Sequence, residues 1–356
     1  MKNAFIILLA AVFYGATALA AQDASGIYQV FVSRGASSGA GDQLILTNLL
    51  SGAQIRASVN GERYTIVGDE ILYYDRAAHR VRLVGPDGSV RDHPFMQPSA
   101  ASRRIDWLVS PDGGRLAWTI TEGSSSALMT ITTVANIDGS DRREVLVDGP
   151  RDGIRAFPVA FSDNGDTLYM DYQPDLIGDL TPFRQYAGMF SVDLETLDVA
   201  MLPGEPGCFC GGGIGRDRFL RLALTEDLRG FDVHLYDLPD GPRVVIPALN
   251  LTGFTQGGDV LISSDGTRAV YALAQVRDFG TPQMSVRSVF VLVNLVERTQ
   301  TALTQPITTF VRPIGWTDHD SAILFTSPTL DGTWKINLAD GTLTKVAAAT
   351  YVGLLR

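Results

Sequence analysis

The chain has 356 residues, of which 45% are hydrophobic and 36 are glycine, a composition typical of a globular, turn-rich protein. The formal net charge of −10 at pH 7 disfavours nucleic acids and anionic membrane surfaces as partners. No proline- or serine-rich linker divides the sequence, so we expect a single folded domain.

The N-terminal residues 1–20 have the features of a secretory signal peptide. Lys2 gives a positive start, residues 4–18 are apolar, and Ala18-Leu19-Ala20 is a small-x-small cleavage site. A retained membrane anchor stays open as an alternative, because the apolar run approaches the ~17–25 residues that can span a bilayer. We expect export to the periplasm or cell exterior, with residues 21–356 forming the mature domain. The membrane is a partner only if the segment is retained.

A strand–turn–strand unit recurs along the mature chain. Its clearest copy is residues 107–120, WLVSPDGGRLAWTI, in which an apolar strand, a Ser-Pro-Asp-Gly-Gly turn and an alternating strand follow one another. Weaker copies begin at Ala160, Val260 and Gly315. The period is roughly 50 residues, near the longest propeller repeats. Two further short strands follow each copy, so each period contains four strands.

Four short strands per period correspond to one blade of a β-propeller. In chain order the predicted blades are residues 23–61, 63–97, 102–149, 150–206, 207–249, 250–306 and 307–356. The first blade lacks its own innermost strand, and Thr350–Leu355 (TYVGLL) is apolar and β-prone. We therefore predict an all-β fold, a single β-propeller of about seven four-stranded blades. In this fold the C-terminal strand pairs beside residues 27–32 and closes the ring.

The residues that carry the turn also carry a family resemblance. The sequence SPDGGRLAW, residues 110–118, resembles the WD40-like (PD40-type) repeat of TolB-type β-propellers, which prolyl-oligopeptidase-type peptidases also use. Only Ser110-Pro111-Asp112-Gly113 keeps the full motif. The extra α/β domain that precedes the TolB propeller is not visible in this sequence. The resemblance therefore implies the propeller fold, and it does not imply the TolB partner.

Several short patterns could indicate catalysis or metal binding. Residues 35–39 match G-x-S-x-G, a hydrolase pattern that requires a strand-to-helix elbow, whereas strands flank it here and indicate a flexible loop. For Cys208 and Cys210 we favour a local disulfide, ahead of free buried thiols and of a metal site. The four histidines are far apart in sequence and the paired acids sit in turns. We expect no metal, cofactor or catalytic residue.

Arginine residues mark one candidate binding surface. Arg104, Arg155 and Arg312 each stand a few residues before a predicted innermost strand, and such entry points gather around one mouth of a propeller channel. The alternative, polar side chains on solvated connectors, stays open.

Loops between the second and third strands of each blade share a face with these connectors and vary most in length. They are residues 34–41, 123–126, 173–186, 227–231 and 275–287. Arg184, Tyr186, Arg277 and Phe279 in these loops are expected to ring the same mouth. Since arginine offers a planar fork suited to carboxylate or phosphate, this face is predicted to take an anionic ligand or an acidic peptide.

We therefore expect an exported, monomeric propeller that acts as a binding or scaffold module of the cell envelope, with a protein or an anionic small molecule as its partner. The alternative is an enzyme of hydrolase or lyase type with its site at the channel mouth. Convergence of three or more titratable groups in a pocket at the mouth would favour the enzyme. A mouth plugged by apolar side chains would favour binding.

Overall fold

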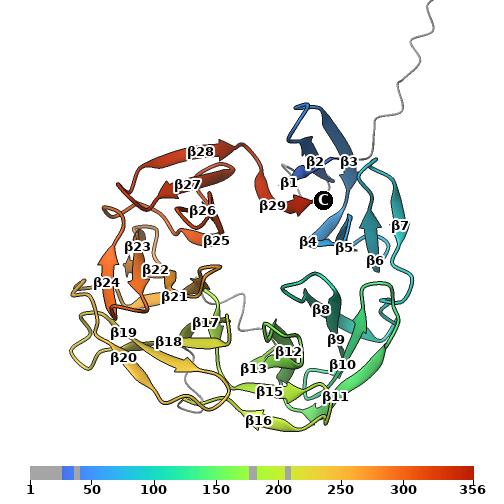
Figure 1. Ribbon diagram of the computed structural model, residues 1–356, viewed down its shortest axis with the longest axis horizontal. Helices are drawn as coiled ribbons and strands as arrows, with labels where there is room; N and C mark the ends of the chain where they lie inside the picture. Colours follow the sequence, from blue (N-terminus) through green and yellow to red (C-terminus); the bar gives the residue numbers. More distant parts are fainter. Residues whose placement is uncertain (1–25, 36–40, 176–182, 205–209) are drawn as a thin grey trace, which may run out of the picture.

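A computed structural model of the chain is a ring of seven β-sheets around a central channel (Figure 1). It describes residues 26–35, 41–175, 183–204 and 210–356, and these residues contain no helix. The predicted all-β, seven-bladed propeller is therefore confirmed. The predicted signal peptide, residues 36–39 of the G-x-S-x-G match, and Cys208 lie outside the described residues.

The C-terminal strand closes the ring as predicted. Blade one has the order β29 (Thr350–Leu355), β1 (Tyr28–Ser33), β2 (Asp42–Asn48) and β3 (Gln54–Val59). β29 is antiparallel to β1, with Leu355 opposite Tyr28 and Thr350 opposite Val32. Both ends of the chain thus build one sheet, which leaves no open gap between the first and last blades.

The other blades follow in sequence, each with its first strand innermost, except that β14 (Gln185–Tyr186) adds a fifth strand at the inner edge of blade five. Blade two is β4 (Gly61–Val67), β5 (Glu70–Asp75), β6 (Arg80–Val84) and β7 (Val90–Asp92). Blade three is β8 (Ser102–Val109), β9 (Arg115–Ser124), β10 (Ala127–Asn136) and β11 (Arg143–Arg151). Blade four is β12 (Ile154–Phe161), β13 (Thr167–Pro174), β15 (Met189–Asp193) and β16 (Val199–Met201).

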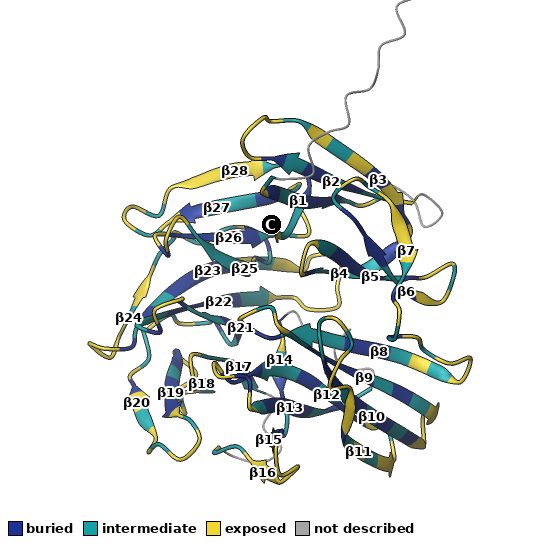
Figure 2. Ribbon diagram, turned by 45° about the vertical axis from the view of Figure 1, so that its right-hand side comes forward, coloured by how far each residue is buried: buried dark blue, intermediate teal, exposed yellow. Residues whose placement is uncertain are grey.

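Blade five contains β17 (Cys210–Gly215), β18 (Arg218–Leu224), β19 (Phe231–Asp237) and β20 (Val244–Ile246). Blade six is β21 (Gln256–Ile262), β22 (Arg268–Arg277), β23 (Ser285–Asn294) and β24 (Thr299–Ala302). Blade seven is β25 (Arg312–Thr317), β26 (Ala322–Thr326), β27 (Thr333–Asn337) and β28 (Leu343–Ala347). Outermost strands such as β16 and β28 are mostly exposed, whereas the middle strands are buried (Figure 2).

The repeated turn motif also joins neighbouring blades. Gly113 has a φ of 74°, which the tight turn requires, and Ser110 accepts a hydrogen bond at 2.8 Å from the amide of Arg115 across that turn. The Arg115 guanidinium then donates to the Gly165 carbonyl in the turn of the next blade. The Trp107 indole donates at 3.0 Å to Thr65 in the preceding blade. The motif therefore contributes to contacts between blades as well as to its own hairpin.

Innermost strands of six blades are interrupted by β-bulges, in β29, β4, β8, β12, β21 and β25. Arg63 lies in the bulge of β4 with a φ of 59°, and Asp259 lies in the bulge of β21 with a φ of 54°. A bulge turns a side chain away from the regular alternation of the strand. Both of these side chains belong to the site described next.

Candidate functional site at the channel mouth

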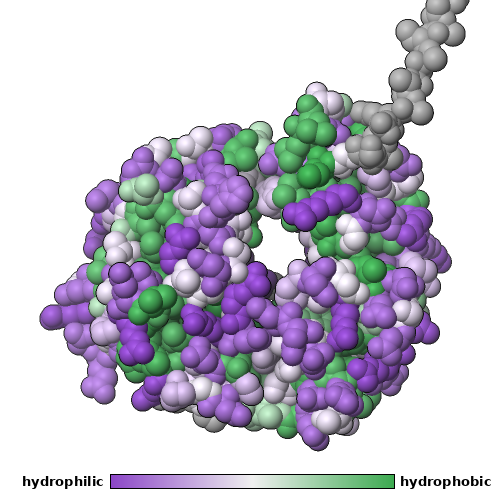
Figure 3. Space-filling model, viewed as in Figure 1, coloured by the Kyte–Doolittle hydropathy of each residue, from purple (hydrophilic) through white to green (hydrophobic). Residues whose placement is uncertain are grey.

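A cavity of about 490 Å³ opens where the innermost strands begin. Five arginines line it, against a single carboxylate, Asp106. The arginines come from four blades and from the insertion of blade four: Arg63, Arg104, Arg155, Arg184 and Arg312. Side chains do not close the centre of the ring, and hydrophilic residues border much of the opening (Figure 3). The mouth is therefore open and positively charged.

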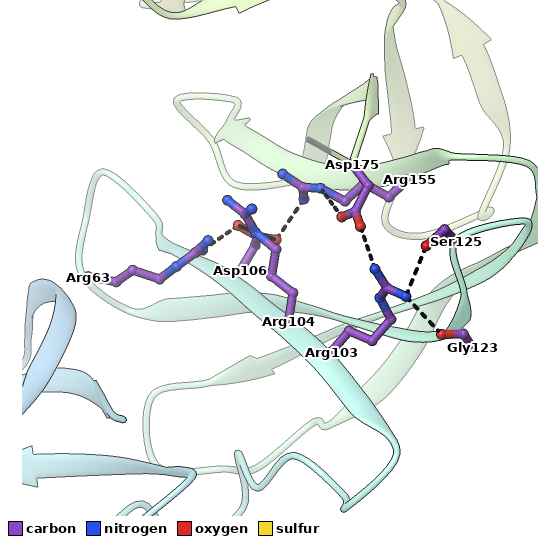
Figure 4. Close-up of polar contacts among 8 residues, drawn as sticks. All are labelled: Arg63, Arg103, Arg104, Asp106, Gly123, Ser125, Arg155 and Asp175. Atoms are coloured by element: carbon purple, nitrogen blue, oxygen red, sulfur yellow. Dashed lines mark hydrogen bonds and ion pairs between the residues drawn. The ribbon is translucent and has the colours of Figure 1, made fainter. Parts of the chain in front are cut away.

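Three of these arginines converge on Asp106 in β8 (Figure 4). Arg155 Nη1 lies 2.7 Å from Asp106 Oδ2, and Arg104 Nε lies 3.2 Å from the same oxygen. Arg63 contacts the other oxygen, Oδ1. Three guanidinium groups against one carboxylate leave two positive charges in this cluster.

Burial by itself would raise the pKa of Asp106, but the charges of Arg63, Arg155 and Arg104 outweigh it and hold the pKa below its usual value. Burial lowers the pKa of Arg155, because only 4% of this residue is exposed. Even a lowered arginine pKa leaves the guanidinium charged at neutral pH. Asp106 is therefore an ionised counter-charge that orients three arginine side chains.

A second carboxylate, that of Asp175, also forms an ion pair with Arg155. Asp175 Oδ1 lies 3.4 Å from Arg155 Nε, and Asp175 Oδ2 lies 3.1 Å from Arg103 Nη2 (Figure 4). Arg155 Nε is nevertheless buried without a hydrogen bond of good geometry. The Arg155 guanidinium also lies 4.8 Å from the centre of the Phe157 ring. Its position is thus fixed by packing and charge rather than by a complete set of hydrogen bonds.

The other side of the mouth is organised by Asp259. Its carboxylate accepts hydrogen bonds from Arg312, at 2.8 Å from Nε and 3.2 Å from Nη2, and from the main-chain amide of Arg184 at 3.0 Å. The bidentate geometry fixes the plane of the Arg312 guanidinium. Asp259 therefore joins blade six, blade seven and the insertion of blade four.

Arg184 differs from its neighbours because no ion pair joins its side chain to a carboxylate of the described residues. Its pKa is raised, first by Tyr186, which also hydrogen-bonds to it, and to a lesser extent by Asp259. Arg184 is exposed to solvent. It thus presents to the cavity a positive charge that no carboxylate of the described residues pairs with directly.

Glycines in blades five and six make room for the segment that carries Arg184. The residues Gln185–Tyr186 form β14, which pairs with Gly211 and Cys210 at the inner edge of β17. A Cβ on Gly258 would lie 2.7 Å from the Arg184 carbonyl oxygen and 2.7 Å from Phe183 Cβ. Any larger residue at Gly258 would therefore displace the segment from the mouth.

A buried carboxylate anchors the far end of the same segment. Asp171, which is fully buried in β13, accepts hydrogen bonds from the amides of Gly188 at 2.7 Å and Ala187 at 3.1 Å. Burial raises the pKa of Asp171 to about 6, although these two amides oppose the shift. The insertion is thus held on both sides of β14, by Asp259 and by Asp171.

The structure brings most of the predicted site residues together. Arg104, Arg155, Arg312, Arg184 and Tyr186 all line the cavity. They do not stand on connectors as expected: the first three lie within β8, β12 and β25, because these strands begin earlier than the apolar pattern indicates. Arg155 is moreover buried rather than solvated.

Arg277 and Phe279 are not part of the cavity lining. They lie at the tip of the β22–β23 hairpin, where Phe279 is 81% exposed. A partner contact through these two residues stays a prediction.

The sequence patterns do not predict three residues that organise the site: Arg63, Asp106 and Asp259. Asp106 stands two residues after the predicted site residue Arg104, in the sequence Arg103-Arg104-Ile105-Asp106-Trp107. The alternation of charged and apolar residues there was a usable signal. Arg63 and Asp259 are placed by bulges, for which the sequence carries no comparable mark.

None of the described histidines lines the cavity at the mouth. His93 is buried in blade two and His319 lies in a turn of blade seven. In the described part of the chain, no three His, Cys, Asp or Glu side chains are grouped so as to hold a metal ion. The described residues also include no helix that is long and apolar enough to cross a membrane. Because Cys208 lies outside the described ranges, its predicted pairing with Cys210 stays a prediction.

Comparison with known proteins supports the fold at a distance. No protein-family model and no curated protein matches the sequence. Among solved structures, a prolyl endopeptidase is 11% identical, with a TM-score of 0.60 over 89% of this chain and 49% of its own. Oligogalacturonate lyase in complex with manganese is 12% identical, with a TM-score of 0.56 over 86% of both chains.

TolB from Acinetobacter baumannii is also a structural neighbour. It is 11% identical and covers 91% of this chain and 82% of its own, with a TM-score of 0.45. The chain spans about half the length of the prolyl endopeptidase it matches. The TM-scores of the prolyl endopeptidase and the lyase show a shared propeller fold, and identities this low carry no information about activity.

Proposed function

We propose that this propeller is a binding module that captures an anionic ligand, either an acidic segment of a protein or a small polyanion, at its channel mouth. The observation that carries the proposal is the set of five arginine side chains that line one cavity against a single carboxylate. Such a concentration of positive charge is unexpected in a chain with a net charge of −10, unless it serves recognition.

The arrangement also limits the cost of binding. Asp106 and Asp259 hold Arg63, Arg104 and Arg312 in place before any ligand arrives, so little side-chain entropy is lost on association. Each guanidinium has five N–H donors, of which these carboxylates use at most two. The remaining donors are available to an anion. Export to the cell envelope remains part of the proposal and depends on the N-terminal sequence alone.

Binding is tested with a fluorescein-labelled octaglutamate peptide and fluorescence anisotropy at low salt, with octaglutamine as the uncharged probe. Arg104→Ala and Arg184→Ala each remove one exposed guanidinium and leave the Arg155–Asp106 pair intact. A charge-assisted hydrogen bond contributes about 1.5–3 kcal/mol, so each variant should weaken octaglutamate binding roughly tenfold or more.

The matched control is Arg56→Ala, which removes the same charge from β3 on the outer edge of blade one, where the Arg56 side chain hydrogen-bonds to Gln43 and Gln54. The control should bind like the wild type. Equal affinity of all four proteins, or equal binding of octaglutamine, would refute the proposal.

A second candidate is an enzyme that acts on an anionic substrate, of the lyase or hydrolase type. Its support is the convergence of Arg63, Arg104, Arg155 and Asp106, which meets the criterion of three or more titratable groups in one pocket at the mouth. The open mouth agrees with it as well. The four groups are better suited to holding charge than to moving protons, because the guanidiniums stay protonated and the pKa of Asp106 is lowered.

The two candidates are separated by turnover. Oligogalacturonates and glutamate-rich peptides are incubated with the wild type, with divalent cations present and absent, and the products are followed by mass spectrometry. Cleavage that Arg104→Ala abolishes and Arg56→Ala does not would establish the enzyme.

A further inference from the structure

A second cavity adjoins the first along the innermost strands. Its volume is about 360 Å³, and it shares Arg184, Tyr186 and Arg312 with the cavity at the mouth. A ligand held by these arginines therefore contacts both cavities. We call the second one the inner cavity.

The walls of the inner cavity differ from those of the mouth. Beyond the shared residues and Asp259 they consist of uncharged groups: Gly212, Val260, Leu261, Pro313, Ile314 and Thr326. Two of its three charged residues, Arg184 and Arg312, line both cavities. The third, Asp259, accepts hydrogen bonds from the Arg184 main-chain amide and the Arg312 guanidinium. The remaining wall offers a carboxylate or phosphate no charged partner.

The difference between the charged mouth and the uncharged wall determines how a ligand is oriented. An anionic group placed against Val260, Leu261 and Ile314 meets no charged partner on that wall. An apolar group in the same place gains by covering these apolar side chains. The Arg184 guanidinium lines both cavities and can donate hydrogen bonds to the anion where they meet.

We propose that the protein recognises an organic carboxylate attached to a compact apolar group, with the carboxylate at Arg184 and the apolar group in the inner cavity. This inference rests on the proposed binding of anions at the mouth and names the ligand class. The C-terminal residue of a polypeptide with an apolar side chain has this chemistry, and so does a medium-chain fatty acid. A uniformly charged polymer occupies the mouth alone.

The test uses the full protein and fluorescein-labelled Gly-Gly-Gly-Leu, compared with the same peptide as its C-terminal amide and with Gly-Gly-Gly-Asp. We expect the Leu acid to bind at least tenfold more tightly than either comparison peptide. Competition with N-acetyl-leucine and with octanoate identifies the source, because the better competitor shows whether the peptide terminus or the fatty acid is preferred.

Ile314→Glu places a carboxylate on the wall of the inner cavity. It should weaken binding of the Leu acid at least tenfold and leave octaglutamate binding within twofold of the wild type. The matched control Val296→Glu adds the same charge in an exposed turn of blade six and should change neither. If circular dichroism shows that Ile314→Glu does not fold, Thr326→Asp repeats the test from β26.

This inference is overturned if the Leu acid and its amide bind equally well. It is also overturned if folded Ile314→Glu prefers the Leu acid as strongly as the wild type does. Octaglutamate binding is unaffected in either case. If Arg104→Ala and Arg184→Ala instead bind octaglutamate as tightly as the wild type, the proposed function is overturned. The two failures are therefore distinguishable.

Discussion

Closure of the ring by β29 makes Leu355 a sensitive position for stability. Leu355 is 1% exposed and packs with Tyr28, Val30 and Ile71, whereas its neighbour Leu354 points outward and is 38% exposed. Replacing a buried leucine with alanine costs about 2–5 kcal/mol. Because β29 is the edge strand of its sheet, the cavity wall can partly relax, and we expect the lower half of that range.

The expected shift in melting temperature follows from the size of the protein. An unfolding entropy of about 2.1 cal/mol/K per residue gives roughly 0.7 kcal/mol/K for a chain of about 330 folded residues. Leu355→Ala should therefore lower Tm by about 3–5 °C, whereas Leu354→Ala should change it by less than about 1 °C.

Deletion of residues 351–356 also removes Val352 and Tyr351, whose ring lies 5.6 Å from that of Phe31, and it exposes the paired edge of β1. The loss of apolar burial is roughly 6–8 kcal/mol, which corresponds to a fall in Tm of about 10 °C. The measurement is differential scanning fluorimetry with circular dichroism. Equal shifts for the two leucine variants, or an unchanged Tm for the truncated chain, would refute closure by β29.

The remaining predictions concern the charged cluster and a buried histidine. Asp106→Ala should destabilise the protein by about 3–5 kcal/mol, because it leaves Arg155 buried without its nearest counter-charge. Asp106→Ala combined with Arg155→Met should be more stable than Asp106→Ala alone in urea unfolding, and strictly additive losses would contradict the pairing. Burial, and to a lesser extent the charge of Arg91, lowers the pKa of His93 to about 4 in the folded protein. Between pH 6.5 and pH 4 the histidine is therefore protonated in the unfolded chain but neutral in the folded one. Stability should therefore fall by up to about 3 kcal/mol as the pH drops through that window, and His93→Gln should lose this part of the dependence. Asp171, whose pKa is raised to about 6, contributes with the opposite sign, so the comparison is made between wild type and variant at each pH. A His93→Gln variant with the pH profile of the wild type would contradict this assignment.

The sequence by itself determines the architecture of this protein. Strand alternation and the turn residues of Ser110-Pro111-Asp112-Gly113 act over a few residues, so their repetition reveals the blades without any knowledge of distant contacts. Counting periods also leads to the closing strand, because an unfilled edge in the first blade has one apolar candidate, Thr350–Leu355. Both inferences use local chemistry and arithmetic alone.

The charged site depended on the tertiary structure. Arg104 and Arg155 are separated by about one blade in sequence, and only the packing of blade three against blade four places their guanidiniums on one carboxylate. The sequence indicated arginines at the mouth, but it did not reveal that Asp106 and Asp259 hold them. Arg63 and Asp259 reach the mouth through bulges with left-handed backbone, and a bulge reflects how strands of different length fit in the ring. The inner cavity is likewise a product of packing between blades, since Gly212, Leu261 and Ile314 come from three different sheets.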